Sequence, residues 1–436
     1  MLIFFIVAIF VLGYASIALE SFTKVNKAAV ALLMCVLCWT VYVLGANAHV
    51  GDILQEHLGE TAETLFFLMG AMTIVEVVDA NGGFNFVRDA LKTRSKKKLL
   101  WRVAFMTFFL SAILDNLTTS IVMIMVLRKL IHDRNERLLY AALVVISANS
   151  GGAFSPIGDV TTIMLWIKGT VTTPGVLKDL FLPSLISMIV PAFLLSLQLK
   201  GKFDKAQNLH VGDIPTFTKR QRQTVFCFGV GGLIFVPVFK TITHLPPYMG
   251  ILLVLGLLWT ITEIFNRHLE EHDPMAKRVT HMLSRIDMST ILFFLGILMA
   301  VACLQTVGVL DTVGQSLDTA FDHNSYFITG IIGVLSAIVD NVPLVAGCMG
   351  MYDIATPEAV AAAPDLVTKM VDGEFWQLLA YCAGVGGSML IIGSAAGVVV
   401  MGLEKISFGW YLQKITWIAF VGYLCGIGVY ALEMVF

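Results

Sequence analysis

Three aspartates stand inside apolar segments of the chain, where a carboxylate is costly to bury. Asp115 and Asp340 belong to a repeated sequence, Ser-Ala-Ile-Leu-Asp-Asn at 111–116 and Ser-Ala-Ile-Val-Asp-Asn at 336–341. Asp159 closes a stretch rich in glycine and serine. An isolated charge at the middle of a bilayer costs at least about 2.5–3.5 kcal/mol on insertion scales. No Lys or Arg lies in these segments, so we expect a bound cation or protons to neutralise the aspartates.

Oxygen-bearing side chains and helix-breaking residues surround these aspartates. Glycine and proline would interrupt helices at four places and free backbone carbonyls there, which a membrane tolerates only inside protein or beside water. Small hard cations select carboxylate, carbonyl and hydroxyl oxygens, so the pattern predicts a cation site, and carboxylates that accept either a cation or protons make an exchanger. The candidate ion- or proton-binding residues are Asp115, Asn116, Thr118, Thr119, Asn149, Ser150, Ser155, Asp159, Thr161, Thr162, Asp340, Asn341, Ser388 and Ser394. The residues expected to shape the breaks are Gly151, Gly152, Pro156, Gly158, Pro343, Gly386, Gly387 and Gly393.

Several of these residues also have a structural interpretation. Asp159 could cap a helix N-terminus at a break, where the helix dipole favours a negative charge. Asn116 and Asn341 could do no more than satisfy backbone groups at two turns. Pro156, Pro343 and the glycines are interpreted as structural. Residue types and spacing leave both interpretations of the polar residues open.

The composition places these residues in a polytopic membrane protein. Of 436 residues, 57% are hydrophobic and only 14% are charged, whereas soluble domains carry about 25% charged residues. Apolar runs at residues 2–19, 28–46, 180–199 and 411–432 are each near the roughly 20 residues that a spanning helix needs. The first run lacks a basic flank and a small-residue cleavage site, so we expect a retained span. With no transit sequence before it, we expect a bacterial plasma (inner) membrane.

The charges of the loops predict the topology, because Lys and Arg are enriched in cytoplasmic loops. Basic loops flank residues 99–127 on both sides, which predicts a re-entrant hairpin that enters from the cytoplasm. Loops that share a single basic residue flank residues 326–352, which predicts a second hairpin from the outside. Residues 200–223 form a basic, cytoplasmic linker. Ten crossings and two hairpins then put both chain termini outside, on the periplasmic face.

The two hairpins belong to two copies of one arrangement in opposite orientation. The first repeat covers residues 1–199 and contains a broken helix at 138–171. The second covers residues 224–436 and contains a broken helix at 375–403. We therefore expect an all-α polytopic membrane protein of two inverted-topology repeats, each with a re-entrant hairpin and a broken transmembrane helix. Transporters of this architecture bind their substrate at the interface between the repeats.

The sequences around the aspartates resemble the NhaD-type Na⁺/H⁺ antiporters. These belong to an ion-transporter superfamily that also contains arsenite-efflux membrane subunits and citrate and dicarboxylate carriers. The resemblance runs through essentially the whole chain and is most specific at Ile-Leu-Asp-Asn-Leu-Thr-Thr (113–119), at residues 147–162 and at Ile-Val-Asp-Asn-Val-Pro (338–343). It implies secondary antiport of intracellular Na⁺ or Li⁺ against external protons, usually at alkaline pH. It also implies a homodimer in the lipid bilayer, with a scaffold of flanking spans and an elevator-like transport domain that carries both hairpins.

From the carboxylates themselves we place Na⁺ at Asp115 and Asp340, with Asp159 as a third candidate. We expect no cofactor besides the transported Na⁺ or Li⁺ and H⁺, and no nucleic-acid partner. The dicarboxylate carriers have neutral Ser-Asn-Thr tips where this chain has Asp-Asn, which favours a cation over an anion. Ser394 stands where the first break has Asp159, so we do not expect two equivalent cation sites.

Two other functions stay open. An anion or arsenite carrier of the same superfamily is the nearer one; the lack of basic residues argues against a carboxylate substrate but less against neutral arsenous acid. An intramembrane aspartyl protease also needs paired aspartates, but such enzymes use Gly-x-Gly-Asp, and Pro156 takes the first position here. The sequence contains no Gly-x-x-x-x-Gly-Lys-Ser/Thr loop, so we do not expect ATP-driven pumping.

Overall fold

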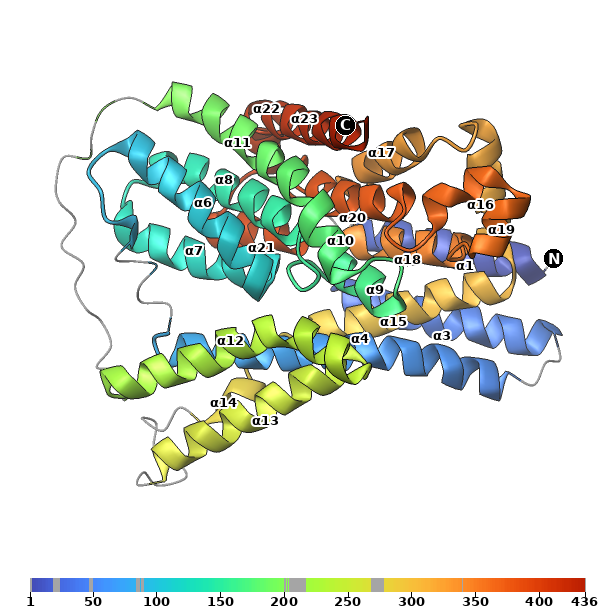
Figure 1. Cartoon of the computed structure of the whole chain (residues 1–436), viewed down its shortest axis with the longest axis horizontal. Helices are drawn as coiled ribbons and strands as arrows, with labels where there is room; N and C mark the ends of the chain where they lie inside the picture. The colour runs from blue at the N-terminus through green and yellow to red at the C-terminus, as the bar shows by residue number, and fades with distance from the viewer. Residues whose placement is uncertain are drawn as a thin grey trace.

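The computed structural model describes residues 2–18, 24–46, 50–83, 87, 90–199, 201, 203, 217–267, 278–338 and 340–435. Within these residues every regular element is a helix (Figure 1). The expected all-α class is therefore correct for the described part of the chain. Most of the predicted cytoplasmic linker, residues 204–216, lies outside the described residues.

The helices form two groups, each of which packs mainly within itself (Figure 1). The α4 group contains α1 (Leu2–Ala18), α3 (Lys27–Ala46), α4 (Gly51–Ala80), α12 (Lys219–Thr243), α13 (Pro247–Asn266), α14 (Val279–Leu283) and α15 (Met288–Thr306). The α8 group contains α6 (Lys96–Leu114), α7 (Asn116–Leu130), α8 (Arg134–Ala153), α9 (Val160–Lys168), α10 (Thr173–Asp179), α11 (Phe181–Gln198), α16 (Val309–Ala320), α17 (Ser325–Ser336), α18 (Asn341–Met351), α19 (Pro357–Ala362), η1 (Pro364–Lys369), α20 (Glu374–Gly386), α21 (Ala395–Glu404), α22 (Phe408–Lys414) and α23 (Thr416–Val435). The two groups meet chiefly where α15 contacts α18 and α16, α12 contacts α6 and α4 contacts α9.

Seven of the described helices are long and apolar enough to cross a bilayer, and they are α3, α4, α11, α12, α13, α15 and α23. With the shorter apolar helix α1 and the two interrupted helices α8–α9 and α20–α21, they account for the ten predicted crossings. That all ten cross a membrane stays a prediction. One expected span is wrong in extent, because the run 411–432 is divided at Ile415 between α22 and α23. Tyr411 is buried and its hydroxyl donates to the Ser388 carbonyl at 2.8 Å, which keeps α22 against the break between α20 and α21.

The predicted hairpin at residues 99–127 is a helical hairpin formed by α6 and α7, and it turns at Asp115. Its outer ends lie together, because Lys96 at the start of α6 pairs with Glu136 while Arg128 near the end of α7 and Arg137 both pair with Glu404. Glu136 and Arg137 open α8, so both ends of the hairpin lie beside the N-terminus of α8. Whether its turn lies within a bilayer stays a prediction.

The predicted hairpin at residues 326–352 is formed by α17 and α18 and also has its outer ends together. The Tyr326 ring lies 6.3 Å from that of Tyr430, whose hydroxyl donates to Gln377 in the first turn of α20. The Tyr352 ring, just beyond α18, lies 4.7 Å from that of Phe375, also in that turn. In Figure 1 the ends of the first hairpin lie on the left and the start of α17 lies on the right. The two hairpins thus extend towards each other from opposite ends of the α8 group.

Matching contacts join each hairpin to its broken helix. Ser111 donates to the Ala148 carbonyl at 2.6 Å, and Ser336 donates to the Ala383 carbonyl at 2.8 Å. A Cβ on Gly151 would lie 2.1 Å from the Phe108 oxygen, and one on Gly386 would lie 2.2 Å from the Gly333 oxygen. Glycine is required at both places because two backbones touch. These contacts are what two copies of one motif would make, and the inverted orientation of the copies in a membrane stays a prediction.

Candidate ion-binding site

The centre of the α8 group holds one buried carboxylate, that of Asp159, whose residue is 1% exposed. It lies in the break between α8 and α9, where Oδ1 accepts a hydrogen bond from the Thr161 amide at 3.2 Å and so caps α9. Oδ2 accepts from the side-chain amide of Asn116 at 2.8 Å, and the amide of Asn341 approaches Oδ1 at 3.5 Å. The asparagines at the turns of both hairpins therefore converge on one carboxylate.

A line of polar side chains connects this carboxylate to the second broken helix. Asn116 also donates to the side-chain oxygen Oδ1 of Asn149 at 3.2 Å, and the side-chain amide of Asn149 donates to the Ser394 hydroxyl at 3.0 Å. Ser394 occupies the position in its break that Asp159 occupies in the first, and it caps α21 by accepting from the Gly397 amide. We call Asn116, Asn149, Asp159, Asn341 and Ser394 the central cluster. All five are at most 4% exposed.

The second half contributes backbone and space rather than a second carboxylate. Gly384 of α20 faces the cluster, and a Cβ there would lie 3.5 Å from Asp159 Oδ2 and 3.3 Å from Ala153. A larger side chain at position 384 would fill the room beside the carboxylate. The central cluster is thus asymmetric, as Ser394 predicts.

Three of the predicted hydroxyl ligands are buried without a hydrogen-bond partner in the described part of the chain. They are Thr119, Thr161 and Thr162. A buried hydroxyl without a partner costs stability, and each of these oxygens remains available to coordinate an ion. Thr161 and Thr162 stand in the first turn of α9, directly after Asp159.

The two turn aspartates do not join the central cluster through any described hydrogen bond. Asp115 accepts from the Thr118 amide at 2.7 Å and from its hydroxyl at 2.8 Å, and so caps α7. It stands at φ +90°, a conformation that non-glycine residues rarely adopt and that is often found at functional sites. Its surroundings are apolar, because it lines a cavity of about 20 Å³ with Phe67 of α4 and Leu233 of α12 among others. In the described residues no three His, Cys, Asp or Glu side chains come close enough to hold one metal ion.

Asp340 has a basic partner that the sequence did not reveal. Its Oδ2 lies 2.7 Å from the ammonium of Lys27, at the start of α3. The expectation that only a transported cation or protons neutralise these aspartates is therefore wrong for Asp340. Lys27 stands at the edge of an apolar run, more than 300 positions from Asp340 in the sequence, so no local signal connected Lys27 with Asp340.

The remaining candidate residues fill structural roles in this state. Ser155 donates to the Ala112 carbonyl, Ser388 donates to the Val385 carbonyl, and Ser150 accepts from Ser187 at 2.8 Å. Pro343 stands in the first turn of α18, where a missing amide does no harm. The glycines of the breaks allow backbones to come close. A Cβ on Gly152 would lie 2.5 Å, and one on Gly387 2.8 Å, from a carbonyl oxygen across the same break, and a Cβ on Gly158 or Gly393 would meet the backbone of the hairpin. Pro156 lies in the first break itself.

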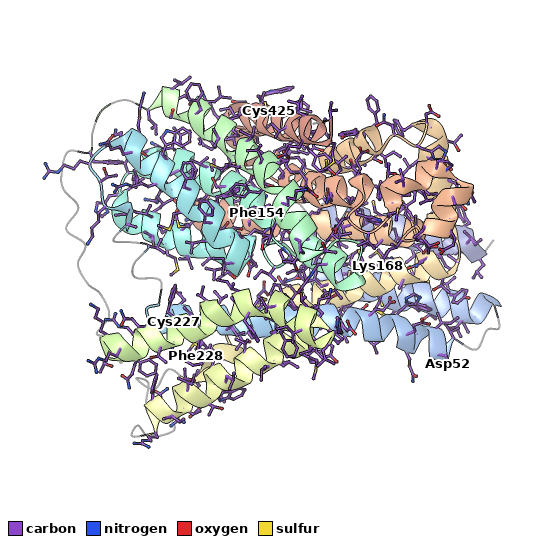
Figure 2. The ribbon with its side chains drawn as sticks, viewed as in Figure 1. Asp52, Phe154, Lys168, Cys227, Phe228 and Cys425 are labelled. Carbon is purple, nitrogen blue, oxygen red and sulfur yellow. The ribbon has the colours of Figure 1, made fainter. Side chains whose placement is uncertain are left out.

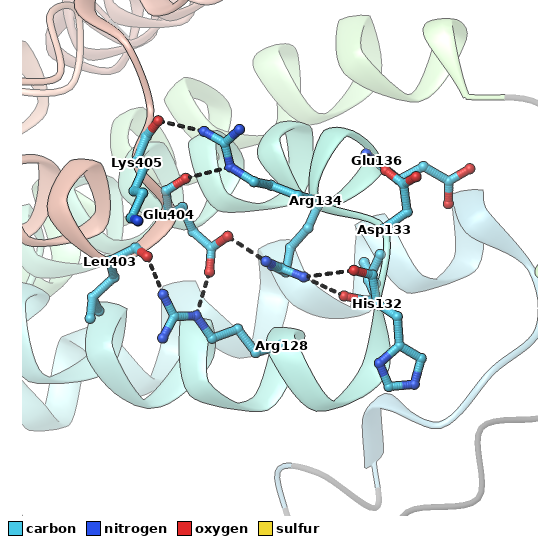
Figure 3. Close-up of polar contacts among 10 residues, drawn as sticks. Arg128, His132, Asp133, Arg134, Glu136, Leu403, Glu404 and Lys405 are labelled. Atoms are coloured by element: carbon cyan, nitrogen blue, oxygen red, sulfur yellow. Dashed lines mark hydrogen bonds and ion pairs between the residues drawn. The ribbon is translucent and has the colours of Figure 1, made fainter.

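The sequence also did not indicate a second buried carboxylate, that of Glu404 at the end of α21. Its side chain is 1% exposed and pairs with Arg128 at 2.7 Å and with Arg137 at 2.8 Å (Figure 3). Arg134 donates to the Glu404 and Lys405 carbonyls. This arginine cluster ties both halves of the chain together within the α8 group. The available signal was a lone glutamate after an apolar run, opposite a loop with three arginines.

A cavity of about 590 Å³ opens between the two groups at the far ends of α9 and α18. Carboxylates from α4 (Glu56, Glu60 and Glu63) and Asp353 line it. Lys168, at the end of α9 and labelled in Figure 2, lines it as well. Carboxylates outnumber basic groups on its wall, which raises the local concentration of cations. The α9 helix spans nine residues, about 13 Å at 1.5 Å per residue, so this cavity and the central cluster lie at its two ends.

Known proteins match this chain along most of its length. The family described as CitMHS, citrate transporter, matches residues 14–371. Sodium/proton antiporter 1 of Arabidopsis thaliana is 48% identical over 427 residues, which cover 97% of this chain and 71% of the relative. Sodium/proton antiporter 2 of the same plant is 45% identical and covers 97% of both chains. The Na⁺/H⁺ antiporter NhaD of Vibrio parahaemolyticus is 34% identical over 389 residues, 83% of this chain and 88% of the relative.

The helical fold, the apolar spans and these matches define the class as a secondary membrane transporter, not an enzyme. The chain belongs to the CitMHS transporter family and to the NhaD-type antiporters, which its aspartate motifs resemble.

Proposed function

We propose that this protein exchanges Na⁺ for H⁺ across a membrane, with the Asp159 carboxylate as the group that accepts either ion. The observation that carries the proposal is the isolation of this carboxylate. It is 1% exposed, and its described side-chain partners are neutral amides rather than a basic group. A charge buried in this way needs a counter-ion, and both Na⁺ and H⁺ can supply it. The relatives named as sodium/proton antiporters support the choice of ions.

Exchange at one carboxylate requires that Na⁺ and a proton exclude each other. In the arrangement described here, Asn116 and Asn341 direct their amide nitrogens at Asp159. A bound cation needs oxygen ligands, so we propose that these side-chain amides rotate to present their carbonyl oxygens. The unpartnered hydroxyls of Thr161 and Thr162 would complete the ligands. When a proton replaces Na⁺, the amides return to donating towards the carboxyl group.

We propose that the direction is export of cytoplasmic Na⁺ or Li⁺ against entry of external H⁺, by alternating access. The limited packing between the two groups supports a movement of the α8 group against the α4 group, because few helix pairs would have to slide. The acidic cavity at the interface would attract cations on one side of the membrane. From the family resemblance we further propose a homodimer in a bacterial inner membrane with external termini. Light scattering of the purified protein in detergent tests the dimer.

An anion carrier is the second candidate, because the matching family is described by citrate. Four helix N-termini, those of α7, α9, α18 and α21, begin at the two hairpin turns and the two breaks, and helix N-termini favour anions. Each of them is capped by a side chain of the protein itself, Asp115, Asp159, Asp340 or Ser394. Three of these caps are carboxylates that would repel a citrate, so we propose a cation rather than an anion as the transported ion.

The test uses everted membrane vesicles from cells that express the protein and lack their own exchangers. Respiration acidifies the vesicle lumen, and a pH-sensitive dye reports the gradient. Added Na⁺ or Li⁺ should dissipate the gradient, and citrate or arsenite should not. A gradient that stays intact with Na⁺ across pH 7–9.5, together with citrate or arsenite uptake, would replace this proposal with the anion carrier.

A further inference from the structure

Lys27 owes its position to a close crossing of two helices in the α4 group. A Cβ on Gly296 of α15 would lie 2.6 Å from the backbone of Ala31 in α3, so these helices touch there without an intervening side chain. Lys27 lies one helical turn before Ala31 on the same face. Its ammonium sits 4.2 Å from the centre of the Phe293 ring, about one turn before Gly296. A cation over an aromatic face is stabilised there, which directs this side chain along α15 towards α18.

The ion pair of Lys27 crosses from one helix group to the other. Asp340 uses Oδ1 to cap α18, accepting from the Val342 amide at 3.3 Å, and Oδ2 to hold Lys27 at 2.7 Å. The two side chains are only 20% and 11% exposed, so water screens the pair weakly. Asn341, the next residue, reaches Asp159. The pair therefore lies one residue from the central cluster.

The first hairpin has no described equivalent of this pair. Asp115 accepts hydrogen bonds from Thr118, in its own turn, and faces the apolar wall formed with Phe67 and Leu233. One of the two hairpin turns thus carries a cation supplied by the protein. A movement that separates α3 from the turn of the second hairpin has to break this contact, because Lys27 belongs to one group and Asp340 to the other.

We propose that Lys27 is the resident counter-cation of Asp340. Na⁺ displaces Lys27 as it binds beside the second hairpin, and this releases the turn of that hairpin from α3. This inference rests on the proposed Na⁺/H⁺ exchange and assigns a residue to it. Lys27 is a positioning residue: it holds the hairpin in the Na⁺-free state and competes with the Na⁺ that binds at Asp159, for which the Asp340 carboxylate becomes a further ligand once Lys27 has left. The displaced ammonium keeps its contact with the Phe293 ring, so it is not left without an interaction.

The first test compares the half-saturating Na⁺ concentration of exchange in three variants at equal expression. Lys27→Met keeps the length of the side chain and removes its charge, so it should lower this concentration by about tenfold, which corresponds to about 1.4 kcal/mol of lost competition. Lys27→Arg keeps the charge and should stay close to the unmodified protein. The matched control is Lys240→Met, since Lys240 also crosses between the groups but binds the Trp166 carbonyl and ring rather than a carboxylate. It should leave the half-saturating concentration unchanged.

The second test reads Na⁺ binding without transport, through the stabilisation of the purified protein against heat by NaCl relative to choline chloride. Lys27→Met, or Lys27→Gln if the former does not fold, should reach half of its stabilisation at a lower Na⁺ concentration. In an Asp340→Asn background the same substitution should have no further effect, because Lys27 acts through Asp340.

An unchanged Na⁺ dependence in Lys27→Met would overturn the inference, and so would an effect that persists in the Asp340→Asn background. A failure of the proposed function is distinct from both. The unmodified protein would then show neither exchange nor a stabilisation specific to Na⁺.

Discussion

The arginine cluster around Glu404 makes a prediction about how the α8 group holds together. Glu404 → Gln keeps the shape of the side chain and removes its charge, which leaves Arg128 and Arg137 without their shared carboxylate. Breaking a buried pair by removing one partner costs about 3–5 kcal/mol. Arg128 is 43% exposed, so water compensates it in part, whereas Arg137 is only 12% exposed. We expect the free energy of unfolding to fall by about 2–4 kcal/mol.

The assay for this prediction is unfolding of the purified protein in mixed micelles with increasing SDS. The matched control is Glu136→Gln, which removes the carboxylate of the Lys96–Glu136 pair at the same end of the molecule. Glu136 is 39% exposed, and exposed pairs contribute about 1 kcal/mol or less. If Glu404→Gln costs no more than this control, the cluster does not hold the two halves together and the reasoning is refuted.

Two further predictions concern backbone packing and topology. Gly386→Ala should destabilise the protein by about 1–3 kcal/mol, because its Cβ would meet the Gly333 carbonyl. The control is Gly402→Ala, whose Cβ would enter open space. Thermal unfolding compares the two variants, and equal stability would contradict the close packing at Gly386. After the native cysteines are replaced, exposed Cys227 included, single cysteines at positions 97 and 132 should be labelled from the cytoplasm and one at position 358 from outside. Labelling of positions 97 and 132 from opposite sides would disprove the re-entrant hairpin.

The turns and breaks could be predicted from the sequence because their causes are local. Asp115 and Asp340 cap the helices that follow them, and Gly151 and Gly386 allow two backbones to touch. These residue types determine backbone geometry within a few positions, so helices end and begin again at these residues, while the re-entrant and inverted arrangement in a membrane stays a prediction. The asymmetry of the two breaks was also visible, because Ser394 replaces Asp159 at the matching position.

The convergence of side chains across the fold could not be predicted in this way. Which of the three aspartates lies at the centre depends on how four helix ends meet, and the structure places Asp159 there instead of the turn aspartates. The bond from Asn149 to Ser394 and the pair of Lys27 with Asp340 join residues 245 and 313 positions apart. Lys27 and Glu404 stand at the ends of apolar runs, where charged residues are common, so nothing in the sequence distinguished them.

The central claim is that Asp159 carries the exchanged ions, and one substitution separates that role from a structural one. Asp159 caps α9, and Asp133 caps α8 in the same way by accepting from the Glu136 amide at 2.9 Å. Asparagine caps helices as well as aspartate does, but it can neither bind a cation by charge nor accept a proton. Na⁺-dependent dissipation of the pH gradient in everted vesicles should therefore vanish in Asp159→Asn and persist in Asp133→Asn, with both proteins present at equal amounts in the membrane. Full exchange by Asp159→Asn would contradict the account, because the carboxylate would then be only a cap.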